Sequence, residues 1–119
     1  MLTVTKSFEF DYAHKLPNYK GKCENLHGHR GKLSITLNGC PNKKKKDGMV
    51  IDFSDVKSIV QPLIDKLDHA YLNDFIDNPT AENMIKFVLD ELQKTELAYH
   101  IVKIRIYETP DSYAEYLLK

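Results

Sequence analysis

Two segments near the N-terminus alternate apolar and polar residues, and this period of two constrains the fold more than any other feature of the chain. In the first segment the apolar positions, interrupted only at Lys6, are Leu2, Val4, Phe8, Phe10 and Tyr12. In the second segment, from His29 to Asn38, they are Leu33, Ile35 and Leu37. Such alternation is typical of β-strands with one buried face. We therefore expect two antiparallel strands, joined through a polar loop at residues 17–23.

The rest of the chain contains helical and strand-like patterns. One apolar stripe has the spacing of a helix face: Val56, Ile59, Val60, Leu63, Ile64 and Leu67. A second helix is expected after Thr80, its N-cap, and residues 102–107 and 113–118 again alternate like strands. Residues 49–51 resemble a further short strand. We expect a single α+β domain over residues 1–119, with a four-stranded antiparallel sheet and two helices on one face.

The charge balance narrows the classes of partner. The chain has 17 Lys and Arg residues and 17 Asp and Glu residues, so its formal net charge is zero. Charge-driven binding to nucleic acid or to anionic membranes needs a basic excess or patch, and neither partner is expected. The sequence has no run approaching the roughly 18 apolar residues of a membrane span, and no signal-peptide pattern. We expect a cytoplasmic protein whose self-association is not opposed by net charge.

Three of the five histidines lie close together in the sequence. His27 and His29 are two residues apart, so on a strand their side chains project from the same face, about 6.6 Å apart along the backbone. His14 ends the first strand in phase with Phe10 and Tyr12, and strand pairing would bring it beside the other two. Three converging neutral imidazoles are unfavourable without a metal, whereas Zn²⁺ accepts three histidines and keeps a fourth position open. The sequence therefore predicts a catalytic zinc site held by these three histidines.

Three other parts of the chain carry side chains suited to catalysis or binding. Cys23 precedes His27 by four residues, where a nearby dication would lower the pKa of its thiol and suit it to act as a base or nucleophile; an inert thiol and a zinc ligand are the alternatives. Asp68 and His69 form a possible proton shuttle or an ordinary exposed helix end. Glu108 ends an apolar strand, either as an ordinary charge or as an acceptor for the N–C–NH₂ edge of a heterocycle. The residues alone leave these alternatives open.

A series of short motifs runs through nearly the whole chain. In order, they are Phe10-Asp11-Tyr12-Ala13-His14-Lys15-Leu16, Cys23-Glu24-Asn25-Leu26-His27-Gly28-His29, Val50-Ile51-Asp52-Phe53, Leu67-Asp68-His69-Ala70-Tyr71-Leu72-Asn73, Asn78-Pro79-Thr80-Ala81-Glu82 and Tyr107-Glu108-Thr109-Pro110. Together these motifs resemble the 6-pyruvoyl-tetrahydropterin synthase / 6-carboxy-tetrahydropterin synthase family. Their number and order make this resemblance far more specific than any single motif.

The resemblance implies a fold, an assembly and a set of catalytic residues. The fold would be the tunnelling fold, in which protomers form a homohexamer of two stacked trimers with active sites at subunit interfaces. The three histidines would hold zinc. Cys23 would be the general base, assisted by Asp68 and His69 of a neighbouring subunit.

The resemblance also implies a substrate, 7,8-dihydroneopterin triphosphate. Glu108 would anchor the pterin ring, and Thr80 and Lys15 are further candidates for substrate binding. Lys15 and Arg30 flank the zinc histidines and are the candidates for contacting the triphosphate. Zinc would bind the side-chain oxygens of the substrate and acidify them as a Lewis acid.

The compact length and the ending Tyr107-Glu108-Thr109-Pro110 resemble most the queuosine branch of the family. Members of this branch are lyases that form 6-carboxy-5,6,7,8-tetrahydropterin and acetaldehyde. Glu24, directly after Cys23, resembles instead a folate-route subgroup that forms 6-hydroxymethyl-7,8-dihydropterin. The biopterin-route reaction is a third alternative, and a non-catalytic zinc- or pterin-binding module is a fourth. The presence of candidate proton-transfer residues beside the metal ligands favours an enzyme.

Overall fold

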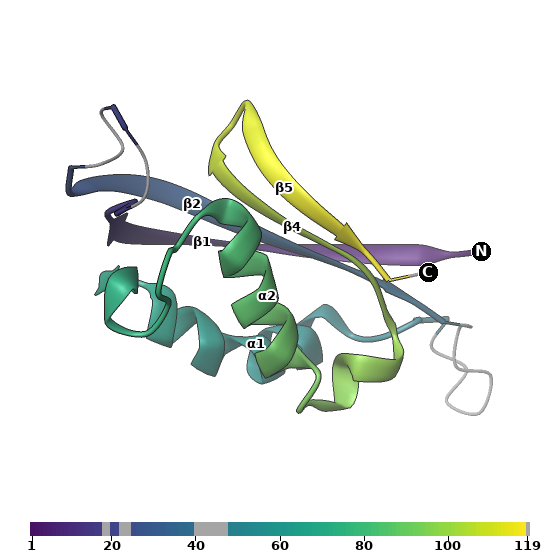
Figure 1. Ribbon diagram of the computed structural model, residues 1–119. Helices are drawn as coiled ribbons and strands as arrows, with labels where there is room; N and C mark the ends of the chain where they lie inside the picture. The colour runs from purple at the N-terminus through teal and green to yellow at the C-terminus, as the bar shows by residue number, and fades with distance from the viewer. Residues whose placement is uncertain (18–19, 22–24, 40–47, 119) are drawn as a thin grey trace.

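The protein folds as one sheet with two helices packed against one face. The computed structural model describes residues 1–17, 20–21, 25–39 and 48–118. In chain order the elements are β1 (Thr3–His14), β2 (His27–Asn38), α1 (Phe53–Leu67), β3 (Ala70–Tyr71), the 3-10 helix η2 (Leu72–Asp74), α2 (Ala81–Leu92), the 3-10 helix η3 (Glu96–Tyr99), β4 (Ile101–Thr109) and β5 (Ser112–Leu117). Figure 1 shows α1 and α2 together beneath the sheet. The expected α+β class, with both helices on one face, is confirmed.

The sheet is built around the pairing of β1 with β2. These strands are antiparallel along their whole length, from Thr3 opposite Asn38 to His14 opposite His27. β4 pairs antiparallel with the other edge of β2, and β5 pairs antiparallel with β4. The strand order is therefore β3-β1-β2-β4-β5. The four antiparallel strands are those that the alternating sequence predicts.

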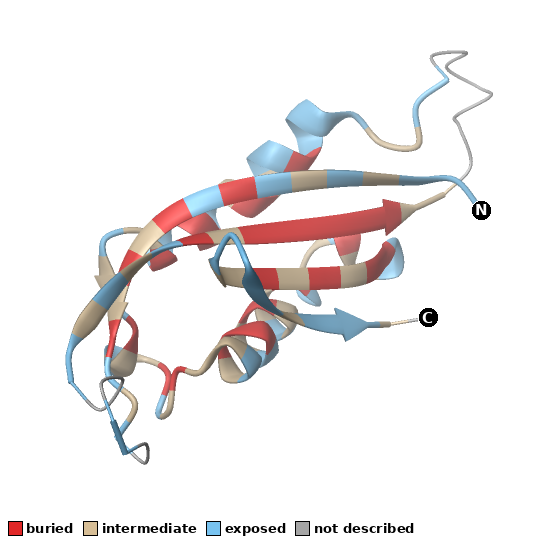
Figure 2. Ribbon diagram, turned by 90° about the horizontal axis from the view of Figure 1, so that it is seen from above, coloured by how far each residue is buried: buried red, intermediate tan, exposed pale blue. Residues whose placement is uncertain are grey.

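Alternation along the strands places their apolar side chains between the sheet and the helices. On β1, Phe8, Phe10 and Tyr12 are buried, whereas Ser7 and Glu9, on either side of Phe8, are exposed. Figure 2 shows this change between buried and exposed residues along the strand. Facing core residues on β2 and β4 are completely buried: Leu33, Ile35, Leu37, Ile104 and Ile106. Burial of this apolar surface, at about 25 cal/mol per Å², is the main stabilising contribution to the fold.

Both helices begin at a side-chain cap and bury one apolar face. Asp52 caps α1 by accepting a hydrogen bond of 2.8 Å from the Ser54 amide, and Thr80 caps α2 by accepting one of 3.1 Å from the Asn83 amide. The buried residues are Val56, Val60, Leu63, Ile64 and Leu67 on α1 and Met84, Ile85, Val88 and Leu92 on α2. Within the described ranges, no helix has the length and apolar character needed to cross a membrane.

The sheet differs in two details from the sequence-based expectation. Residues 49–51 do not form a strand, and β1 and β4 occupy both edges of β2 at this end of the sheet. Asn38 is opposite Thr3 of β1, and its amide donates to the His100 carbonyl oxygen at 2.8 Å. The sheet also has a fifth strand, the two-residue β3, which pairs parallel with β1. A strand of two residues is too short to show alternation, so the sequence pattern does not reveal it.

Gly31 is the position on β2 where packing requires the absence of a side chain. It lies opposite Phe10 in the β1–β2 register. A Cβ atom at Gly31 would lie 2.7 Å from Cε1 of Tyr12 and 3.2 Å from Cζ of Phe10. Both rings are buried in a close-packed core and have little room to move aside. The glycine therefore gives the two aromatic rings the space that they occupy above β2.

We expect Gly31→Ala to destabilise the protein by about 1–3 kcal/mol, the usual effect of overpacking a core. Urea unfolding followed by circular dichroism measures this loss. Gly28→Ala is the matched control, because a Cβ atom there would lie at an ordinary contact distance, 3.4 Å from the Tyr12 carbonyl oxygen. Equal stability of the two variants would contradict the packing role assigned to Gly31.

Candidate functional site

The ends of β1 and β2 bring together His14, His27 and His29, the three-histidine cluster. His14 lies opposite His27 in the strand register, and His29 follows two residues later on the same face of β2. The ring centroids of His14 and His27 are 4.5 Å apart, and His29 lies 5.2 Å and 4.9 Å from them, respectively. One nitrogen of each ring lies within 4.8 Å of the others. The cluster can therefore hold a metal ion.

Hydrogen bonds to backbone carbonyls fix the tautomers of two of these rings. Nδ1–H of His14 donates to the Pro79 carbonyl oxygen at 2.7 Å, and Nδ1–H of His27 donates to the Asn25 carbonyl oxygen at 2.8 Å. A carbonyl oxygen only accepts, so in the neutral rings each Nε2 carries a lone pair. These two Nε2 atoms lie 2.9 Å apart. Two facing lone pairs repel unless a cation accepts both, so the donor set fits a metal ion.

Burial favours the neutral, metal-binding form of His14 and His29. The His14 side chain is fully buried, and this burial is the largest cause of the lowering of its pKa. Burial also lowers the pKa of His29, and the nearby imidazoles of His14 and His27 add to this effect. Metal binding requires unprotonated imidazole nitrogens. The environment of these two histidines therefore favours metal binding.

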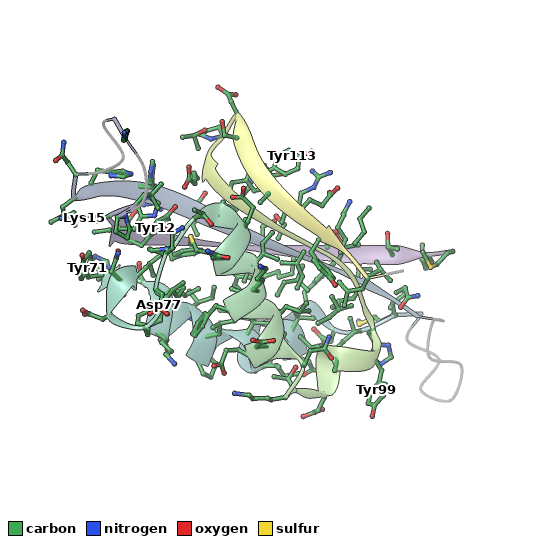
Figure 3. All side chains as sticks on the ribbon, viewed as in Figure 1. Tyr12, Lys15, Tyr71, Asp77, Tyr99 and Tyr113 are labelled. Atoms are coloured by element: carbon green, nitrogen blue, oxygen red, sulfur yellow. The ribbon has the colours of Figure 1, made fainter. Side chains whose placement is uncertain are left out.

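Tyr12 lies against two of the histidines, although the sequence pattern assigns it to the core. Its ring is edge-on to that of His14, with 5.3 Å between centroids, and 5.7 Å from that of His29. The hydroxyl oxygen is buried and has no hydrogen-bond partner among the described residues. Burial raises the pKa of Tyr12, so the hydroxyl keeps its proton. Figure 3 shows Tyr12 near Lys15 at this end of the molecule.

Glu108, near the end of β4, lies beside the three-histidine cluster. Its Oε1 atom is 3.9 Å from Nε2 of His14. Glu108 also lines a pocket of about 430 Å³, whose other lining residues come from α2 and the β5 region: Ala81, Glu82, Ser112, Tyr113, Ala114 and Glu115. Small-molecule sites have volumes of this order. The structure thus places the Glu108 carboxylate between the cluster and a pocket of suitable size for a small ligand.

Asp68 and His69 form a second group, the Asp68–His69 pair. Nδ1 of His69 lies 3.0 Å from Oδ2 of Asp68. The Asp11 amide donates to Oδ1 of Asp68 at 2.9 Å, and this hydrogen bond is the main cause that lowers the pKa of Asp68. The His69 amide donates to the Asp11 carbonyl oxygen at 2.6 Å and holds His69 at a φ of 57°. The backbone of one β1 residue therefore fixes both members of the pair.

The Asp68–His69 pair lies on the other face of β1 from the three-histidine cluster. Ligand atoms of Asp11 and of the pair lie within 4.8 Å of one another. The Asp11 side chain projects away from the face that carries Tyr12 and His14, because side chains alternate along a strand. Within one chain, the structure therefore does not bring the pair to the three-histidine cluster.

Thr80 and Lys15 have structural contacts beside the three-histidine cluster. Thr80 Oγ1 accepts from the Asn83 amide as the cap of α2. The Lys15 amide donates to Oδ1 of Asn73 at 2.9 Å, and its carbonyl oxygen accepts from Nδ2 of Asn73 at 2.8 Å. The Lys15 side chain is exposed. These contacts fix the backbone at both positions and leave the Lys15 ammonium group available to a ligand.

Arg30 lies on the same sheet face as Asp11, because it alternates with the cluster histidines along β2. Its guanidinium group donates to the Glu9 carboxylate at 2.8 Å and 3.1 Å and to the Asp11 carboxylate at 3.4 Å. This candidate for binding a triphosphate is therefore turned away from the three-histidine cluster of its own chain. Cys23 and Glu24, the two candidate bases, lie outside the described residues.

The sequence and the fold are similar to those of known proteins. Residues 3–118 match the profile of the family described as 6-pyruvoyl tetrahydropterin synthase. The chain is 38% identical to 6-carboxy-5,6,7,8-tetrahydropterin synthase of Haemophilus influenzae, covering 98% of this chain and 99% of that protein. It is 35% identical to the enzyme of the same name from Synechocystis sp., and the match covers 98% of this chain and 93% of that protein. The solved structure of Caenorhabditis elegans 6-pyruvoyl tetrahydropterin synthase, which is 25% identical, superposes with a TM-score of 0.88. The superposition covers 99% of this chain and 96% of that one.

We expect the protein to bind about one divalent metal ion per chain at the three-histidine cluster. His27→Ala removes one ligand and is expected to weaken binding by more than about a hundredfold, since loss of an outer partner alone weakens it by about 10- to 100-fold. Equilibrium dialysis against Zn²⁺ or Co²⁺ with elemental analysis measures both quantities. His100→Ala is the control, because His100 contacts the Asn38 carbonyl oxygen at the other end of the sheet. Full metal content in His27→Ala would refute the ligand assignment.

Proposed function

Because the chain belongs to the 6-pyruvoyl tetrahydropterin synthase family, we propose that it is a 6-carboxy-5,6,7,8-tetrahydropterin synthase. The proposed reaction converts 7,8-dihydroneopterin triphosphate to 6-carboxytetrahydropterin, acetaldehyde and triphosphate in the queuosine branch. This reaction cleaves a carbon–carbon bond, so the enzyme is a lyase. The observation that carries the proposal is the three-histidine cluster with the Glu108 carboxylate between it and a pocket of suitable size.

Zinc is the metal proposed for the three-histidine cluster. Two of its rings donate Nδ1–H to backbone carbonyls and turn unprotonated Nε2 atoms toward each other, as metal-binding histidines do. Three histidines with one open position are the ligand pattern of catalytic zinc sites. When bound, zinc would polarise the side-chain oxygens of the substrate and make neighbouring protons easier to remove.

The pterin ring is proposed to bind at Glu108. The N–C–NH₂ edge of a pterin offers two donors side by side, and a carboxylate can accept both. Because Glu108 lies 3.9 Å from His14, a ring bound there would lie beside the cluster. Thr80 directly precedes Ala81, which lines the same pocket, and this position supports a role in substrate binding. Lys15 follows His14 and is exposed, so its ammonium group is suited to meet the phosphates.

Cys23 is the proposed general base, and the Asp68–His69 pair is proposed to assist it. Cys23 stands four residues before His27 in the sequence. A thiolate beside a dication is a competent base. The contact of Asp68 with His69 orients the imidazole ring, and the Asp11 amide holds Asp68 in turn. The ring is thereby positioned to move a proton.

The Asp68–His69 pair is proposed to act in the active site of a neighbouring subunit. The pair lies on the opposite face of β1 from the three-histidine cluster, and the His69 side chain is 79% exposed. A group that is held in place, yet points away from the cluster of its own chain, is suited to complete the site of another copy. We therefore propose that the active sites lie at subunit interfaces. The assembly that we propose is a cytoplasmic homohexamer.

Formation of 6-hydroxymethyl-7,8-dihydropterin is the second candidate function. Glu24 directly follows Cys23, so the loop before the cluster carries two side chains that can act as a base. The choice between them decides which proton is removed and therefore which bond breaks. The biopterin-route reaction would be recognised by its different product, and a zinc- or pterin-binding module by the absence of any product.

Incubating zinc-loaded protein with 7,8-dihydroneopterin triphosphate is expected to release acetaldehyde and a 6-carboxypterin, identified by chromatography and mass spectrometry. Cys23→Ala is expected to slow the reaction by at least about a hundredfold, as loss of a general base does. Glu24→Ala is the matched control and is expected to retain most of the rate. A hydroxymethyl product that depends on Glu24 would replace the proposal by the folate-route reaction. Zinc binding without any product would identify a binding module.

Mixing two inactive variants is expected to restore activity if each site combines two subunits. His29→Ala removes a metal ligand and His69→Ala removes the proton-transfer group, and each alone is expected to be inactive. After dissociation and reassembly at equal amounts, random mixing gives about a quarter of the sites both intact halves, because each half comes from a different subunit. The control mixture of His29→Ala with His27→Ala should stay inactive. Activity in the control, or none in the test mixture, would contradict the shared site.

A further inference from the structure

The Tyr12 hydroxyl is a buried polar group without a partner at the edge of the three-histidine cluster. Tyr12 is only 4% exposed, and its hydroxyl group forms no hydrogen bond with any described residue. A buried hydroxyl without a partner destabilises a protein, so nearly all such groups in folded proteins are hydrogen-bonded. The position of Tyr12 therefore requires an explanation that the ligand-free fold does not supply.

The surrounding residues hold the Tyr12 ring in this position. The ring packs edge-on against His14 and lies tilted against Phe10, with centroids 5.3 Å and 5.4 Å away. Gly31 lies beneath it on β2, and a Cβ atom there would come within 2.7 Å of the ring. A ring confined by a glycine below and an aromatic or imidazole ring on either side has little freedom to turn its hydroxyl toward solvent. The hydroxyl is thus fixed in place before any ligand binds.

None of the described polar groups near the Tyr12 ring forms a hydrogen bond with its hydroxyl. Nδ1 of His14 donates to the Pro79 carbonyl oxygen, and Nε2 of His14 faces Nε2 of His27. The Glu108 carboxylate lies 3.9 Å from Nε2 of His14 and forms no hydrogen bond with Tyr12. Because the Tyr12 ring lies 5.3 Å from that of His14 and 5.7 Å from that of His29, a ligand oxygen at the open position of the three-histidine cluster is a candidate partner for the hydroxyl.

We propose that Tyr12 is a positioning residue whose hydroxyl donates a hydrogen bond to the oxygen ligand at the open position of the three-histidine cluster. This oxygen belongs to water before substrate binds and to the substrate side chain afterwards. The inference rests on the metal centre of the proposed function, but not on which pterin reaction follows. A fixed donor beside the open position favours ligands that bring a hydroxyl or carbonyl oxygen and disfavours alkyl side chains, which would leave the donor unpaired.

Tyr12→Phe tests this role, because it removes the hydroxyl and keeps the ring that fills the space above Gly31. Without metal, the variant is expected to melt at the same temperature as the wild type or higher, since an unpaired buried group is lost. With saturating Zn²⁺, its gain in melting temperature should be smaller than that of the wild type. Its affinity for Co²⁺, measured by competition with a chelating dye, should fall about tenfold, the effect of one hydrogen bond. The cobalt absorption spectrum should also shift.

Tyr116→Phe is the matched control, because Tyr116 is a 45% exposed tyrosine on β5, and it should match the wild type in every measurement. Equal Co²⁺ affinity and equal Zn²⁺-dependent melting in Tyr12→Phe and the wild type would overturn the inference. So would a metal-free variant that melts lower with an unchanged gain from Zn²⁺, because the hydroxyl would then have a structural partner such as water. A wild type that binds no metal would overturn both this inference and the metal centre. If Tyr12→Phe shows the expected weaker Co²⁺ binding and smaller gain from Zn²⁺, but the wild type does not convert pterins, only the proposed reaction would be refuted.

Discussion

The antiparallel pairing of β1 with β2 is the interaction on which the rest of the structure depends. A single register sets His14 opposite His27, Phe10 opposite Gly31 and the apolar residues of both strands toward the helices. A shift of one residue would turn every side chain of one strand to the other face. The shift would then bury Asp11 in the core and move a ligand away from the cluster. The hydrophobic pattern that stabilises the fold therefore also specifies the metal centre, and neither can change without the other.

β1 contributes to the chemistry on both of its faces. Its inner face carries Tyr12 and His14, and the backbone of Asp11 holds the Asp68–His69 pair through one donated and one accepted hydrogen bond. The Asp68–His69 pair is therefore linked to His14 through the three consecutive peptide units between Asp11 and His14, although it faces away from the three-histidine cluster. The pair is therefore held in one position, as the proposed proton transfer to a neighbouring subunit would require.

The sequence predicts most of the fold because the strands and helices here are long and strongly periodic. The alternation of side chains along β1 and β2 is sufficient to place the three histidines on one face. The apolar stripes of the helices are sufficient to place the core. The two-residue β3 and the bent segment at residues 49–51 escape prediction, because one is too short to have a period and the other depends on whether a strand edge is free. The carbonyls of Asn25 and Pro79, which fix the histidine tautomers, carry no side-chain signal at all. Tyr12 escapes prediction because an aromatic residue in an apolar series is indistinguishable from core.

Three features of the site are unfavourable in the ligand-free chain. The Nε2 atoms of His14 and His27 face each other, the Tyr12 hydroxyl lacks a partner among the described residues, and His69 adopts a φ of 57°, which a residue with a side chain seldom adopts. The first two would be relieved by a cation and an oxygen ligand at the same point. Binding energy that would otherwise be lost in arranging the site is then available for affinity, because the core has already arranged it. The pairing of β1 with β2 supplies the stability that keeps these groups in place until the ligand arrives, which explains why they occur on or beside these two strands.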